Sequence, residues 1–134
     1  MTGTFRAAVE AADLTAITRT LDPHIVFHSP VVVRPYLGRD AVVRLLGVLM
    51  EVFEDFRYTD ELVGPAPAAG PPPRALIFRA RAAGTAVQGV DLLEFGTDGL
   101  VTGLTVMVRP LPAAMTLARL VGRRLEEPAA PAAP

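Results

Sequence analysis

Two strand-like runs joined by a turn, in the stretch TAVQGVDLLEFGTDGLVTGLTVMV (residues 85–108), limit the folds open to this chain more than any other part of the sequence. In the first run, every second residue from Val87 onward falls on one face of a strand, and Asp91 is the only acid on that face. The turn Gly96–Gly99 holds residues that tolerate positive φ, so the chain can reverse into the second run. The stretch therefore predicts an antiparallel hairpin with one carboxyl group among apolar side chains.

The carboxyl group of Asp91 has two interpretations, because burial among Val, Leu and Phe penalises its charged form. It could face a dry cavity, where a raised pKa would let it donate a hydrogen bond or move a proton. It could instead pair with an arginine or lie exposed on the sheet, and serve only the fold. The pattern leaves both interpretations open.

The composition removes several kinds of chemistry. The 134 residues suit one domain with one core, and 51% apolar residues with 20% charged residues are typical of a globular chain. Without Cys or Lys, thiolate nucleophiles, zinc–thiolate sites and Schiff bases are excluded. A net charge of −1, no membrane-length apolar run and no signal-peptide pattern favour a cytoplasmic protein that binds neither nucleic acid nor membranes. We expect no cofactor.

Hydrophobic periodicity and turn residues divide the chain into helices and strands. The expected elements are a helix from Phe5 capped by Thr4, a helix capped by Asp13, a strand at His24–His28 extended by Val31–Val33, a helix from Arg39 to Asp55, strands at Phe56–Val63 and Arg74–Ala83 around a proline-rich loop, the hairpin, and a helix at Leu111–Leu125. We expect the last helix to bury Met115 and to pack over a cavity mouth or onto a second subunit. One α+β domain over residues 1–125 and a disordered Ala/Pro tail at 126–134 are predicted.

The passages VFHSPVVVRPYLGRDAV, VFEDFRYT and VDLLEFGTDGLVTGLTVMVRP resemble the nuclear transport factor 2-like superfamily, and within it the SnoaL-like small proteins. The resemblance covers roughly Phe5 to Pro110. It implies a cone-shaped barrel, in which a strongly curved antiparallel sheet wraps around the N-terminal helices and an apolar cavity opens at one end. It also implies a homodimer. It selects no reaction, because this fold hosts isomerases, polyketide cyclases, epoxide hydrolases, binding proteins and protein-transport factors.

Ketosteroid isomerases of this superfamily use an Asp base, together with a Tyr and a protonated Asp that bind the carbonyl oxygen. The resemblance places the protonated acid at Asp91, the base at Ser29 and the tyrosine at Phe5. A serine beside a proline does not abstract protons at neutral pH, and phenylalanine donates no hydrogen bond. Steroid isomerisation by that mechanism is therefore not expected. The epoxide hydrolase pattern is not met either, because its final acid position falls at Val106.

His28 is the second catalytic candidate, because histidine titrates near neutral pH. Strand alternation places its side chain opposite Phe27 and Ser29, so its role depends on which way the strand faces. His24 and His28 cannot share a metal ion, since four strand residues span about 13 Å. An apolar small molecule is the expected ligand, and the residues assigned to its cavity are Phe5, Phe27, Ser29, Tyr36, Leu93, Leu104 and Val106.

Three functions remain open. The first is an isomerase, cyclase or hydrolase-type enzyme without metal, acting on a polyketide- or terpenoid-like substrate with Asp91 as acid/base. The second is a ligand-binding or accessory protein without chemistry, and the third is a protein-interaction module that uses the open sheet face. The first requires a second polar group near Asp91, for which the candidates are His28, Ser29, Tyr36 and Thr105.

Overall fold

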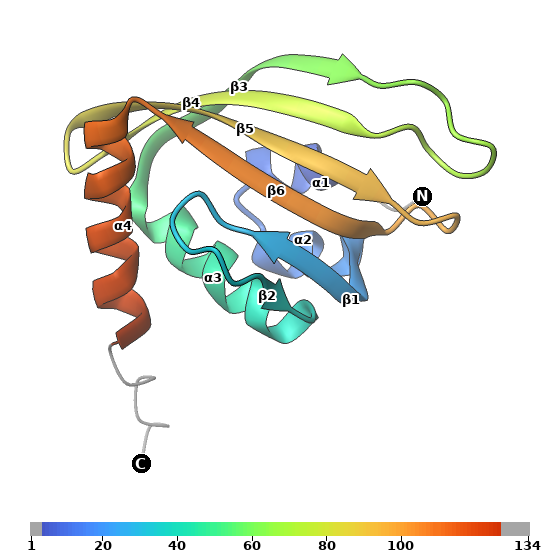
Figure 1. Ribbon diagram of the computed structural model, residues 1–134, viewed down its shortest axis with the longest axis horizontal. Coiled ribbons are helices and arrows are strands. Elements are labelled where there is room, and N and C mark those ends of the chain that lie inside the picture. Colours follow the sequence, from blue (N-terminus) through green and yellow to red (C-terminus); the bar gives the residue numbers. More distant parts are fainter. Residues whose placement is uncertain (1–3, 127–134) are drawn as a thin grey trace.

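A curved six-stranded sheet covers the N-terminal helices with one face in the computed structural model, which describes residues 4–126 (Figure 1). The elements are α1 (Phe5–Glu10), α2 (Leu14–Thr20), β1 (Leu21–His28), β2 (Tyr36–Leu37), α3 (Arg39–Val52), β3 (Phe53–Val63), β4 (Arg74–Ala82), β5 (Thr85–Phe95), β6 (Val101–Arg109) and α4 (Leu111–Glu126). The strand order is β2-β1-β6-β5-β4-β3, with β1 and β6 parallel and the other pairs antiparallel. The α+β prediction is confirmed, but the sheet stays open between β2 and β3 and does not close into a barrel.

Both predicted N-terminal caps are present. The Thr4 hydroxyl accepts a hydrogen bond from the Ala7 amide at 3.0 Å, and the Asp13 carboxylate accepts one from Ala16 at 3.1 Å. Helix α2 passes directly into β1, so the strand begins three residues earlier than predicted and contains Pro23. Proline is tolerated there because the pairing of β1 with β6 is interrupted between Leu21 and Val26.

Two other boundaries differ from the prediction. Residues Val31–Val33 do not extend β1, because the Ser29 hydroxyl binds the amides of Val31 and Val32 and turns the chain outward. Helix α3 ends at Val52, and Phe53 begins β3 instead of completing the helix.

Hairpins join the last four strands as predicted. The proline-rich loop after β3 is closed by a hydrogen bond from the Gly64 amide to the Pro73 carbonyl at 2.8 Å. Ala83 and Gly84 both have positive φ, of 49° and 79°, which is the geometry of a two-residue turn between antiparallel strands. Because side chains alternate along a strand, Leu76 and Phe78 of β4 lie on the buried, concave side of the sheet. The face of β5 that carries Asp91 lies on the same side.

Helix α4 lies at one end of the sheet, beside α3 (Figure 1). It packs on α3 and on β4, β5 and β6, and the Arg44 guanidinium binds the Leu125 carbonyl at 3.0 Å. Ala113 and Leu117 are its buried residues, and Val121 and Leu125 pack partly buried against the core, whereas Met115 is 63% exposed, so the prediction for Met115 was wrong. No described helix is both long and apolar enough to cross a membrane. The predicted tail beyond Glu126 lies outside the described residues.

Candidate active site

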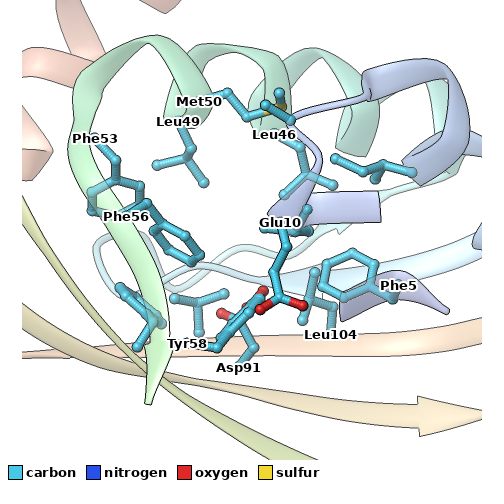
Figure 2. Close-up of a pocket in the computed structure, with 15 residues that line it drawn as sticks. Phe5, Glu10, Leu46, Leu49, Met50, Phe53, Phe56, Tyr58, Asp91 and Leu104 are labelled. Carbon is cyan, nitrogen blue, oxygen red and sulfur yellow. The ribbon is translucent and has the colours of Figure 1, made fainter. Parts of the chain in front are cut away.

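A cavity of about 300 Å³ lies between the three N-terminal helices and the concave face of the sheet (Figure 2). Its walls are mostly apolar. The lining residues are Phe5, Val9, Glu10, Ala12, Ile17, Leu46, Leu49, Met50, Phe53, Phe56, Tyr58, Phe78, Asp91, Leu104 and Val106. Of these residues, only Glu10, Tyr58 and Asp91 carry ionisable side chains. No residue of α4 is among them, so the prediction that this helix covers the cavity mouth does not hold.

Tyr58 and Asp91 reach each other across an intervening strand. Tyr58 of β3 pairs with Phe78 of β4, which in turn pairs with Gly89 of β5, and Asp91 lies two residues further along β5. The Phe78 ring occupies the space above Gly89, where an added Cβ would lie 2.2 Å from the ring. With the strands in this register, the Tyr58 hydroxyl donates a hydrogen bond to Asp91 Oδ2 at 2.7 Å.

Burial controls the protonation of this pair. Asp91 is 7% exposed and Tyr58 8%. Desolvation raises the pKa of Asp91 from 3.8 to about 7, although the hydrogen bond from Tyr58 acts in the opposite direction. Desolvation, followed by the charge and hydrogen bond of Asp91, raises the pKa of Tyr58, which therefore remains a donor. Near neutral pH, Asp91 is divided between its protonated and ionised forms.

The second oxygen of Asp91 is open to the cavity. Tyr58 occupies Oδ2, and Oδ1 has no hydrogen-bond partner among the described residues. Among the described residues, every fully buried side-chain nitrogen or oxygen has a hydrogen-bond partner, so the unpartnered Oδ1 atom is not fully buried. Because Asp91 lines the cavity, its Oδ1 is therefore the atom that a bound molecule can reach.

Aromatic side chains from β3 and β4 fix the orientation of Tyr58. Its ring packs edge-on against Phe56 with centroids 5.0 Å apart, and Phe56 stacks on Phe78 at 4.8 Å. Phe53 packs against both phenylalanines. Such contacts hold the phenol in one rotamer, so that its hydroxyl stays directed at Asp91.

Replacing Tyr58 with phenylalanine is expected to raise the pKa of Asp91 above its value of about 7, because the hydrogen bond from Tyr58 stabilises the carboxylate. The titration of the Asp91 carboxyl carbon, followed by NMR, measures this directly. Tyr36→Phe is the matched control, since Tyr36 does not line the cavity and packs against Phe27 instead. A lower or unchanged Asp91 pKa in Tyr58→Phe would contradict the assigned direction of this hydrogen bond.

The structure brings some of the sequence-predicted site residues together and separates others. Asp91, Phe5, Leu104 and Val106 line the cavity. Leu93 lines a neighbouring hollow that shares Phe5 with the cavity.

The remaining candidates lie elsewhere, which corrects the prediction for them. Phe27 is fully buried beneath Tyr36, and neither residue lines the cavity. Ser29 lies in the turn after β1, where its hydroxyl binds backbone amides. His28 is exposed, because Phe27 occupies the inward position at that point of β1. His28 is therefore not placed to act beside Asp91.

Tyr58, the polar partner of Asp91, was not among the residues predicted from the sequence. The alternation in FRYTDELV places Phe56 and Tyr58 on one face, and this was the available signal. This pattern was ambiguous because it does not continue along the strand. Every residue of β3 after Tyr58 is exposed, so the strand has no continuous buried face. The candidates named instead included Thr105, which pairs with Leu92 on the face opposite Leu104 and Val106.

Comparison with known proteins agrees with this architecture. The model of the SnoaL-like domain family matches residues 3–104. A steroid delta-isomerase from Pseudomonas aeruginosa is 34% identical with a TM-score of 0.82, covering 90% of this chain and 85% of that one. A Silicibacter pomeroyi protein with a cystatin-like fold is 26% identical with a TM-score of 0.81, covering 90% and 82%.

A more distant crystal structure, of a proposed SnoaL-like polyketide cyclase from Shewanella denitrificans, is 16% identical with a TM-score of 0.62 and shares the fold, covering 89% of this chain and 92% of that one. No curated protein matches the chain significantly. The family match spans most of the chain, including β5 and its acid, so the protein belongs to the SnoaL-like domain family, with the nuclear transport factor 2-like fold.

Proposed function

We propose that this protein binds an apolar carbonyl compound in the cavity and promotes proton transfer on it, as an isomerase or cyclase with Asp91 as the acid/base group. One observation carries the proposal. A buried carboxyl group with a pKa of about 7 holds one oxygen on Tyr58 and presents the other to an otherwise apolar cavity.

The chemistry follows from the protonated form of Asp91. Through Oδ1 it would donate a hydrogen bond to the carbonyl oxygen of a ligand, and that bond strengthens as negative charge develops on the oxygen during enolisation. The hydrogen bond from Tyr58 to Oδ2 stabilises the charge that Asp91 acquires when it gives up its proton. Enolisation begins both double-bond isomerisation and intramolecular carbon–carbon bond formation, the reactions of isomerases and cyclases.

The comparisons and the cavity support this class of reaction and suggest first substrates. The relative at 34% identity is called a steroid delta-isomerase. The cavity volume of about 300 Å³ is at the lower end of the range for small-molecule sites, about 300–1,000 Å³. One- and two-ring ketones are therefore the first compounds to test, and a larger ring system would extend through the opening.

Asp91→Asn is expected to reduce turnover of an unsaturated ketone by about 10²–10⁴-fold, the usual contribution of a general acid, because the asparagine amide can donate a hydrogen bond but cannot give up a proton. The assay follows conversion of 3-cyclohexen-1-one to 2-cyclohexen-1-one through the ultraviolet absorbance of the conjugated product. Asp60→Asn is the matched control, because Asp60 is exposed on β3 and does not line the cavity.

Two results would count against the proposal. Equal turnover by the wild type and Asp91→Asn would remove Asp91 from the chemistry. Binding of the apolar probe 2-naphthol, measured by calorimetry, with no turnover of 3-cyclohexen-1-one or of a steroidal β,γ-unsaturated ketone would indicate a ligand-binding protein instead.

A further inference from the structure

Glu10 is the other carboxyl group that lines the cavity. It is the last residue of α1, so it approaches from the helical side, whereas Tyr58 and Asp91 belong to the sheet. Figure 2 shows its side chain directed into the cavity, towards Tyr58 and Asp91. The Glu10 side chain is 48% exposed, which places it at the opening while Asp91 lies at the enclosed end.

The position of Glu10 is fixed by Arg6, one helical turn earlier. Arg6 Nε lies 3.4 Å from Glu10 Oε1, and Arg6 Nη1 lies 3.2 Å from Glu61. The other Glu61 oxygen binds Arg74 at 2.6 Å, so the guanidinium of Arg6 is held by β3 and β4 as well as by its own helix. It also lies 5.7 Å from the centroid of the Tyr58 ring.

This arrangement leaves one Glu10 oxygen available. Arg6 contacts Oε1, and Oε2 has no partner among the described residues. The charge of Glu10 also contributes to the raised pKa of Tyr58, which agrees with their closeness in Figure 2. A carboxylate held on one oxygen, with the other directed into an apolar cavity, has the geometry of a general base.

Enolisation needs two groups at different places on the ligand. One group stabilises the carbonyl oxygen, and another removes a proton from the neighbouring carbon, so a single carboxyl bound to the oxygen cannot serve both. The family resemblance assigned the base to Ser29, which lies outside the cavity. Among the residues that line the cavity, Glu10 is the remaining carboxyl group, and a carboxylate oxygen can accept a proton.

We propose that Glu10 is the base that moves the proton between carbon atoms of the ligand, while Asp91, held by Tyr58, binds the carbonyl oxygen through its other carboxyl oxygen. This inference rests on the proposed function. The Glu10 carboxylate takes a proton from the carbon between the carbonyl and the double bond, and the C–H electron pair forms the enolate with its charge on the oxygen. The protonated Glu10 then returns the proton to the far end of the double bond, where a new C–H bond forms. The carbonyl re-forms, and no other reactant is consumed.

Glu10→Gln is expected to lower kcat for 3-cyclohexen-1-one by about 10²–10⁴-fold, the usual contribution of a general base. Because glutamine keeps the size of the side chain, KM and the affinity for 2-naphthol should change less than about threefold. Exchange of the α-hydrogens of 2-tetralone in D₂O, followed by NMR, should fall in parallel. Glu10→Asp, which retains a carboxylate, should recover part of the exchange rate.

The matched control is Glu51→Gln, because Glu51 is also an exposed, ion-paired glutamate on a helix and does not line the cavity. It should leave turnover and exchange unchanged. If Glu10→Gln keeps kcat and exchange within about threefold while Asp91→Asn loses them, Glu10 is not the base and the proposed function stands. If the wild type neither isomerises nor exchanges these ketones, both proposals are overturned.

Discussion

Asp91→Asn is expected to make the folded protein more stable at pH 8, even though the same change should abolish most turnover. In the folded protein, burial raises the pKa of Asp91 from 3.8 to about 7, a difference of roughly 3 units. At about 1.4 kcal/mol per unit, ionised Asp91 costs the fold on the order of 4 kcal/mol. Asparagine carries no charge, and its side-chain oxygen can still accept the hydrogen bond from Tyr58.

The sign of the pH dependence follows from which state holds the proton. Between about pH 4 and pH 7 the unfolded chain has lost the Asp91 proton while the folded chain retains it. The contribution of Asp91 to the free energy of unfolding is therefore fully present below about pH 4 and is lost as the pH rises through about 7. Other carboxyl groups add their own pH dependence, so the comparison is made between variants that differ at one acid.

Urea unfolding at several pH values between 4 and 8 measures the effect. The free energy of unfolding of the wild type should fall, relative to that of Asp91→Asn, by about 2–4 kcal/mol across this range. Asp60→Asn, which changes an exposed acid on β3, should keep the profile of the wild type. Parallel profiles for the wild type and Asp91→Asn would show that Asp91 titrates alike in the folded and unfolded states, and the proposed acid/base role would lose its basis.

A group that costs stability in its ionised form is expected at a site of chemistry more than in a structural core. The fold supplies the conditions for this cost. Helices α1, α2 and α3 cover the concave face, and β5 carries the acid at a buried position in the cavity wall. The stability measurement therefore tests the functional site without knowledge of the substrate.

The sequence placed Asp91 on the apolar face of its strand because β5 has a continuous alternation, but it left open whether this face borders a cavity. Val87, Gly89, Asp91 and Leu93 are all buried, and their neighbours along the strand are more exposed. The N-terminal caps at Thr4 and Asp13 were predicted equally well, because capping depends on contacts within four residues. These features are local, so the sequence alone carries enough information to place them.

The partner of Asp91 could not be predicted in the same way. Tyr58 and Asp91 are 33 residues apart, and their contact depends on the registers of two strand pairs and on bulges in β3 near Asp55 and Thr59. Alternation specifies a face within one strand but not the register between strands. The early start of β1 and of β3 was missed because α2 and α3 pass into strands without a glycine or proline to mark the boundary.

Gly89→Ala is expected to destabilise the protein by about 3 kcal/mol or more, because the new methyl group has no room. Its Cβ would lie 2.2 Å from the Phe78 ring and 2.7 Å from the Met107 carbonyl oxygen. Phe78 can move away only by losing its packing, since it is 1% exposed and lies against Phe53 and Phe56. The backbone oxygen belongs to β6, which is paired with β5 through this region.

Gly122→Ala is the matched control for the same change of side chain. Gly122 lies within α4 with nothing within 4 Å of the added methyl group, so alanine should stabilise the protein by up to about 1 kcal/mol through its higher helix propensity. The two variants should therefore shift the urea midpoint in opposite directions. Displacement of Phe78 in Gly89→Ala should also push its ring into the cavity and weaken 2-naphthol binding. Unchanged stability and binding in Gly89→Ala would show that β4 and β5 can separate there, and that the register joining Tyr58 to Asp91 is not rigid.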